Sequence, residues 1–100
     1  MRSVTPEEFV ALGPDAHLID VREPDELATV RTEVGQAIPM STLAEHLDEL
    51  PEGPVYVLCH SGGRSAKVTA YLEQQGYDAV NVSGGITAWQ AAGLPVITAG

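Results

Sequence analysis

The feature that most constrains this chain is residues 55–65, VYVLCHSGGRS, where a short apolar run ends at the single cysteine. The apolar and β-branched residues 55–58 predict a buried strand. Gly62 and Gly63 predict a tight loop, and the residues AKVTAYL that follow the loop predict a helix. A strand, a glycine-bearing loop and a helix in this order can surround Cys59 with backbone N–H groups. We therefore expect the fold to be organised around Cys59.

Strand and helix patterns alternate along the rest of the chain. Thr5, Pro6 and Glu8 predict a capped helix start, and Gly76 predicts a helix end. The predicted strands are residues 16–21, 36–39, 55–58 and 79–82, and the predicted helices are residues 6–12, 24–28, 43–50, 63–75 and 86–92. This alternation predicts a single α/β domain, residues 1–100, with a mostly parallel sheet. Ligands of such sheets bind beyond the carboxyl ends of the strands, where we expect Cys59 and Asp20.

The charge of the chain excludes several kinds of partner. Its net charge is −9 and its pI about 4.4, which argues against nucleic acid and against anionic membranes. No apolar run reaches the roughly 20 residues of a membrane span, and no apolar signal region is visible at the N-terminus, which predicts a cytoplasmic location. His17 and His46 lack metal-ligand spacing, so we expect no metal. The acidity itself indicates either solubility or a basic protein partner.

The position of Cys59 is compatible with two roles, a structural cysteine or a reactive one. A lone cysteine on a buried strand is most often an inert small hydrophobe. Cys59, however, stands at the exit of its strand, where Gly62 and Gly63 let backbone amides turn inward. The N-terminus of the next helix and the Arg64 guanidinium add positive charge, which stabilises the thiolate that attacks electrophiles. We therefore favour a reactive cysteine.

The same amides suit an anionic group that the sulfur carries or attacks, which indicates transfer of sulfur or a phosphoryl group onto Cys59. The loop from Cys59 to Arg64 is short. A tetrahedral phosphate needs more room between the sulfur and the amides than one extra sulfur atom, so the loop length favours sulfur transfer. Arsenate reduction is disfavoured because the chain holds no second cysteine to resolve an oxidised intermediate.

The loop CHSGGRS resembles the active-site loop of the rhodanese family, whose pattern is Cys-x-x-Gly-x-Arg-Ser. Similar stretches run in order through nearly the whole chain: LIDVREPDE at 18–26, IPM at 38–40, GGITAW at 84–89 and GLPV at 93–96. The resemblance implies a small central sheet of about five strands with helices on both faces. It also implies a thiosulfate sulfurtransferase-type enzyme without metal or organic cofactor. Such an enzyme takes sulfane sulfur from thiosulfate or a persulfide donor and passes it to cyanide, a thiol or a protein cysteine.

The resemblance also assigns expected roles to residues of this chain. Cys59 would be the nucleophile and persulfide carrier. The residues of the substrate- and persulfide-binding loop would be His60, Ser61, Gly62, Gly63, Arg64 and Ser65. Arg64 would close the loop and support an anionic donor. As supporting residues, we expect Asp20 to accept loop amides and Arg22 to form a buried or partly buried ion pair.

Two departures from the family pattern bear on substrates. Residues 30–37, VRTEVGQA, keep almost none of the family's Gly-His-Ile-Pro-Gly-Ala stretch, which helps to shape the rim of the site. Position 60 is often basic in the family, whereas His60 is only partly charged at neutral pH. A weaker positive rim predicts modest affinity for thiosulfate. The alternative function is a non-catalytic or sulfur-carrier interaction module that serves a specific protein partner.

Overall fold

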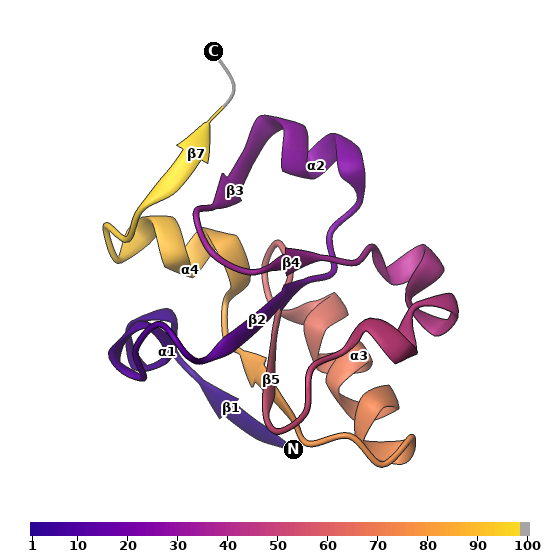
Figure 1. Ribbon diagram of the computed structural model, residues 1–100. Coiled ribbons are helices and arrows are strands. Elements are labelled where there is room, and N and C mark those ends of the chain that lie inside the picture. The colour runs from indigo at the N-terminus through magenta and orange to yellow at the C-terminus, as the bar shows by residue number, and fades with distance from the viewer. Residues whose placement is uncertain (99–100) are drawn as a thin grey trace.

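The computed structural model describes residues 1–98; residues 99–100 of the predicted domain lie outside the described residues. Figure 1 shows the arrangement of the elements. The strands are β1 (Arg2–Val4), β2 (His17–Asp20), β3 (Val30–Thr32), β4 (Gln36–Ala37), β5 (Val55–Leu58), β6 (Ala79–Val82) and β7 (Val96–Thr98). The α-helices are α1 (Pro6–Ala11), α2 (Pro24–Thr29), α3 (Gly63–Gln74) and α4 (Gly85–Ala91), with 3₁₀ helices η1 (Met40–Glu45) and η2 (Leu47–Glu49).

Five strands form the main sheet, in the order β1-β6-β5-β2-β4, and every pair in it is parallel. The predicted parallel sheet of about five strands is therefore confirmed. β5 occupies the centre, with β2 and β6 as its neighbours. Leu58 lies opposite Asp20 on β2, and Val57 lies opposite Asn81 on β6. Because all these strands run the same way, their carboxyl ends meet at one edge of the sheet.

Helices cover both faces of this sheet, as expected (Figure 1). Alternate residues of a strand point to opposite faces, so each central strand supplies two cores. Val57 and Cys59 pack with Val68 and Leu72 of α3 on one face. On the other face Leu58 belongs to the cluster that contains the α1 and α4 residues Phe9, Ile86 and Trp89. Trp89 is buried, and its Nε1–H donates to the Pro95 carbonyl.

Residues 30–37 form two short strands. β3 pairs antiparallel with β7 in a separate two-stranded sheet, with Arg31 opposite Ile97. β4 adds only Gln36 and Ala37 to the edge of the main sheet, shorter than the predicted strand 36–39. The pairing of β3 joins residues more than 60 positions apart in the chain, and no local pattern in the sequence signals it.

The predicted α-helix at residues 43–50 is wrong, because this segment forms η1 and η2 instead. Its backbone bonds span three residues, from His46 N to Leu43 O and from Leu50 N to Leu47 O. Leu43 is buried, and Leu47 and Leu50 pack against the α3-side core, so two short 3₁₀ helices separated at His46 bury the same apolar residues. Pro39 and Pro51 bound the segment and leave little length for a regular helix.

The predicted start of the first helix is confirmed. The Thr5 hydroxyl accepts a hydrogen bond from Glu8 N, the Glu8 carboxylate accepts one from Thr5 N, and Pro6 is the first helical residue. Within residues 1–98 no helix is both long and apolar enough to cross a membrane.

Candidate active site

The candidate site lies at the edge where β5 and β2 end. Cys59 directly follows β5, and Val21 directly follows β2. The two exits are tied together by a hydrogen bond from Val21 N to the Leu58 carbonyl, 2.9 Å long. The sequence-predicted position of Cys59 and Asp20 at this edge is therefore what the structure shows.

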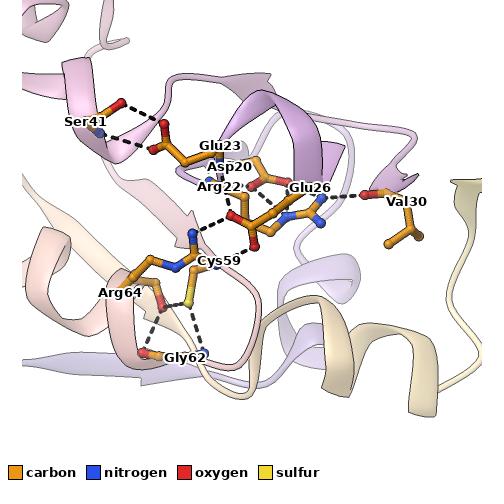
Figure 2. A network of polar contacts seen from close by, with 10 residues as sticks. Asp20, Arg22, Glu23, Glu26, Val30, Ser41, Cys59, Gly62 and Arg64 are labelled. Atoms are coloured by element: carbon orange, nitrogen blue, oxygen red, sulfur yellow. Dashed lines mark hydrogen bonds and ion pairs between the residues drawn. The ribbon is translucent and has the colours of Figure 1, made fainter. Parts of the chain in front are cut away.

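Cys59 lies at the base of the loop that joins β5 to α3. Its side chain is almost completely buried, with 1% of the residue exposed. The N–H of Gly62 turns back and donates to the Cys59 sulfur, with N and Sγ 3.0 Å apart (Figure 2). This turn needs the left-handed backbone of Gly62, whose φ of 107° is open to glycine and strained for other residues. The glycine thus permits an amide to face the sulfur.

The first turn of α3 supplies further amides to the loop. The first backbone bond of this helix runs from Ala66 N to Gly62 O. The N–H groups of Gly63, Arg64 and Ser65 therefore precede the helical ladder and have no acceptor within the helix. Helix termini of this kind, in an α-helix of 12 residues, favour negative charge. The thiolate, or an anion attached to it, is the group that such a cradle stabilises.

α4 holds the loop from the other side. Ile86 N donates to the Cys59 carbonyl at 2.8 Å, and the Thr87 N–H and hydroxyl both donate to the His60 carbonyl at 3.1 Å. Gly85 makes this approach possible, since a Cβ there would overlap the Cys59 carbonyl oxygen and lie 2.6 Å from His60 C and O. Sequence reasoning did not assign this role to Gly85 and Thr87. The available signal is the glycine pair at 84–85, which opens the family-like stretch 84–89.

Arg64 points across the loop to α2. Its Nη1 and Nη2 donate to Oε1 and Oε2 of Glu26, at 2.5 and 2.6 Å. This bidentate bond holds the pKa of Glu26 at about 2, well below its ordinary value of 4.5, and raises the pKa of Arg64. Glu26 lies 38 residues before Arg64 and was not among the predicted site residues. Its only sequence signal was its place in the motif-like stretch 18–26.

Asp20 and Arg22 form a buried ion pair, so Arg22 has the partner type that was expected. Nη2 of Arg22 lies 2.9 Å from Oδ2 of Asp20, and it also donates to the Val30 carbonyl at 2.7 Å. The Asp20 carboxylate accepts one loop amide, the N–H of Arg22 just after β2, and its other side-chain bonds come from the Arg22 guanidinium. Among the described residues, no amide of the 59–65 loop donates to this carboxylate. Asp20 lies opposite Leu58 and so faces away from the side of the sheet on which Cys59 packs.

Ser65 connects the sulfur to the sheet. Its Oγ lies 3.3 Å from Cys59 Sγ, 3.1 Å from the Gly62 carbonyl and 2.5 Å from Oδ1 of Asn81. Ser65 is fully buried, and Asn81 on β6 is 8% exposed. Sequence reasoning missed Asn81, although a polar residue among the apolar residues of the predicted strand 79–82 was a usable signal.

The remaining loop residues form the outer rim. His60, Ser61 and Gly63 are exposed, whereas Gly62 and Arg64 are half-buried. Residues 31–37 of the atypical segment line a separate surface pocket with Asp20, Leu27 and Ile97, and no residue of the 59–65 loop lines that pocket.

Comparison with known proteins supports this arrangement. Residues 5–92 match the family model of the rhodanese-like domain. A protein named sulfurtransferase from Allochromatium vinosum is 40% identical over 85 residues, covering 83% of this chain and 79% of that protein. A thiosulfate sulfurtransferase, GlpE, from Actinobacillus succinogenes is 37% identical over 100 residues, covering 96% and 90% of the two chains.

Solved structures give the same result. The crystal structure of a rhodanese-related protein from Thermoplasma volcanium superposes with a TM-score of 0.90 at 34% identity, covering 97% of this chain and 98% of the other. A rhodanese-like domain protein from Staphylococcus aureus gives a TM-score of 0.82 at 36% identity, covering 89% and 91%. The sequence match, the parallel sheet and the cysteine loop at its carboxyl edge agree. This chain belongs to the rhodanese-like domain family.

Proposed function

We propose that this protein is a sulfurtransferase that carries sulfane sulfur as a persulfide on Cys59. Membership of the rhodanese-like family and relatives named sulfurtransferase support a function of the sulfurtransferase type. One observation carries the specific chemistry. The Cys59 sulfur lies 3.0 Å from the Gly62 N–H, at the base of a loop that continues into the first-turn amides of α3. An amide cradle of this kind stabilises a thiolate and an anionic persulfide alike.

The reaction has two displacement steps. The Cys59 thiolate attacks the sulfane sulfur of the donor, a sulfur–sulfur bond forms, and the sulfur–sulfur bond of the donor breaks. With thiosulfate the leaving group is sulfite, which departs with the bonding electron pair. The acceptor, a thiolate or cyanide, then attacks the terminal sulfur of the persulfide and releases the Cys59 thiolate. No electrons are gained or lost overall, and neither step requires a metal or an organic cofactor.

Loop geometry favours sulfur over phosphate as the transferred group. A persulfide lengthens the Cys59 side chain by one sulfur–sulfur bond of about 2 Å. The loop already brings Gly62 N to within 3.0 Å of Sγ, so a small addition meets amide donors with little rearrangement. In this proposal the amides of residues 60–65 hydrogen-bond the terminal sulfur, and Arg64 acts from the edge of the loop. We place the reaction in the cytoplasm, whose reducing conditions keep a lone thiol free.

The charges around the site weaken the capture of thiosulfate. Arg64 is bound to Glu26, and Arg22 is bound to Asp20, so neither guanidinium faces the loop uncompensated. The whole chain carries a net charge of −9, which repels a dianion such as thiosulfate. We therefore propose modest thiosulfate affinity.

The second candidate is a sulfur-carrier module that exchanges sulfur with one protein partner. The paired arginines and the acidic chain favour it, because they weaken capture of small anions and suit contact with a basic protein. In this candidate Cys59 still accepts sulfur, but turnover with small molecules is negligible.

The persulfide is tested by intact mass. Incubation with thiosulfate or glutathione persulfide is expected to add one sulfur atom, which cyanide removes, and Cys59→Ser is expected to gain none. Uptake of sulfur by Cys59→Ser would refute the proposal. Steady-state rates with thiosulfate, glutathione persulfide and mercaptopyruvate, each with cyanide and thiol acceptors, then separate the two candidates. Loading without turnover for all donors supports the carrier.

A further inference from the structure

A buried chain of polar atoms runs from the Cys59 sulfur into the sheet. Sγ lies 3.3 Å from Ser65 Oγ, and Ser65 Oγ lies 2.5 Å from Oδ1 of Asn81. Cys59 is 1% exposed, Ser65 is fully buried, and Asn81 is 8% exposed. The Asn81 backbone is fixed between two strands, opposite Ser3 of β1 and Val57 of β5. The Asn81 side chain is therefore the adjustable end of this chain of atoms.

In the thiol state the protons along the chain are accounted for. The Cys59 S–H donates to Ser65 Oγ, and the Ser65 hydroxyl has one proton, which it donates to the Asn81 carbonyl oxygen. The Gly62 carbonyl, 3.1 Å from Oγ, is a second acceptor for the same proton. In the thiol state each proton therefore has an acceptor, and no two acceptors face each other.

The thiolate state reverses the first bond. A thiolate has no proton and only accepts, so the Ser65 hydroxyl can bond it only by turning its proton toward the sulfur. The hydroxyl oxygen then presents lone pairs to Asn81 Oδ1 at 2.5 Å, and two acceptors that close repel each other. An asparagine amide has an acceptor and a donor end of nearly the same shape. Rotation of the amide brings Nδ2–H to Ser65 Oγ and restores a donor-to-acceptor chain.

We propose that Asn81 is a positioning residue that acts on Cys59 through Ser65. Its amide orientation follows the state of the sulfur, accepting from Ser65 when Cys59 is a thiol and donating to Ser65 when Cys59 is a thiolate or a persulfide. In the donating orientation the Ser65 hydroxyl is free to bond the anionic sulfur. The relevance to catalysis rests on the sulfurtransferase function proposed above, since the thiolate is the working state of that reaction.

The Asn81→Asp substitution tests the donor role, because it keeps the shape and leaves a group that only accepts at neutral pH. Two readouts at fixed neutral pH are needed: the ultraviolet absorbance of the thiolate and the rate of alkylation by iodoacetamide. We expect both to report less thiolate, with alkylation slower by about tenfold, the effect of losing one hydrogen bond to a charged group. Unchanged alkylation would overturn the proposal.

Asn81→Asp also adds a negative charge, which could act on Cys59 directly. A double-mutant comparison separates this charge effect from the hydrogen-bond relay from Asn81 through Ser65 to Cys59. The charge acts on Cys59 whether or not Ser65 is present, whereas the relay requires its hydroxyl. We expect Asn81→Asp to slow alkylation much less in a Ser65→Ala background than in the wild type. Equal effects in both backgrounds would overturn the proposal. Thr69→Val is the packing control, since it removes the bond from Thr69 Oγ1 to the Ser65 carbonyl, 2.7 Å, and leaves the relay intact.

Asn81→Leu provides a second measurement if Asn81→Asp does not fold. Leucine removes both donor and acceptor, so the Ser65 hydroxyl can still turn to the sulfur without repulsion. We expect it to slow alkylation less than Ser65→Ala does, and a rate as slow as that of Ser65→Ala would contradict the proposal. The outcomes also separate the two proposals. Coupled alkylation rates without sulfur loading refute only the sulfurtransferase function, and normal loading without coupling refutes only the role of Asn81.

Discussion

The Arg64 guanidinium is bound by both carboxylate oxygens of Glu26, at 2.5 and 2.6 Å, in a contact between α3 and α2 (Figure 2). Planar guanidinium and carboxylate groups match in such a two-bond contact, which fixes orientation as well as distance. Arg64 therefore ties the cysteine loop to α2, and its charge is compensated before any donor arrives. This pairing sets the charge that an anionic sulfur donor meets at the loop.

Removing the Glu26 charge should improve the use of thiosulfate. Glu26→Gln leaves the Arg64 charge uncompensated, and we expect KM for thiosulfate to fall about two- to fivefold, the size of a partly exposed charge pair. The measurement is steady-state sulfur transfer to cyanide. Glu7→Gln on α1 is the matched control, since Glu7 is exposed and the change in net charge is the same. An equal fall in KM for both variants would show that only the net charge matters.

The Arg64–Glu26 pair should also make stability depend on pH. Arg64 lowers the pKa of Glu26 from 4.5 to about 2, so the pair stabilises the fold above pH 4.5, and this contribution is lost as the pH falls through about 2. We expect the difference in unfolding free energy between wild type and Glu26→Gln to be full at neutral pH and to disappear toward pH 2. Urea denaturation at a series of pH values measures it. A difference that stays constant over this range would contradict the assignment.

Gly85 should be intolerant of any side chain. Its φ is +58°, and a Cβ would overlap the Cys59 carbonyl oxygen, so Gly85→Ala must displace the loop or α4. We expect a loss of about 2–4 kcal/mol in unfolding free energy, from backbone strain and overpacking together. Sulfur loading of Cys59 should fall as well.

Gly93→Ala is the matched control for Gly85→Ala. Gly93 also has a positive φ, 74°, but a Cβ there meets no atom within 4 Å. We expect only the strain cost of about 1–2 kcal/mol and normal sulfur loading. If both variants lost the same stability and loading, the close approach of α4 to the loop would not be the cause. Intact mass and urea denaturation provide both measurements.

Removing one member of the Asp20–Arg22 pair should lower the unfolding free energy more than removing both charges. Arg22→Met leaves the Asp20 carboxylate buried without its partner, and we expect a loss of about 3–5 kcal/mol in unfolding free energy. Adding Asp20→Asn removes the orphaned charge and should recover part of that loss. Urea denaturation of the two variants is the measurement. A double variant no more stable than Arg22→Met would mean that the Arg22 bond to the Val30 carbonyl is what matters.

Local sequence patterns were sufficient to predict the helices and strands that are determined by neighbouring residues. The capping box at Thr5 and Glu8, the strand before Cys59 and the helix after Gly62 all formed as the sequence indicates. Each depends on groups within a few residues of one another: a cap, an apolar run, or a glycine that accepts a left-handed turn. The parallel sheet also follows from alternation, because joining parallel strands requires crossovers long enough to hold a helix.

Short elements that depend on distant partners were not visible in the sequence. β1, β3 and β7 have three residues each, too few for a periodic signal, and each is a strand only because another strand lies beside it. η1 and η2 differ from the predicted helix because two short 3₁₀ helices separated at His46 bring the apolar residues 43, 47 and 50 to the core as well as one α-helix would. Packing decided between the two.

By itself the sequence determined the loop on which everything else depends, since Cys59, the two glycines and the following helix are contiguous and their geometry is local. Only the tertiary structure decided what surrounds that loop. Glu26 lies 38 residues before its partner Arg64, and Asn81 lies 16 residues after its partner Ser65. Hydrogen bonds between distant residues depend on which strands and helices become neighbours, and that is settled by burial of two cores rather than by any pattern along the chain.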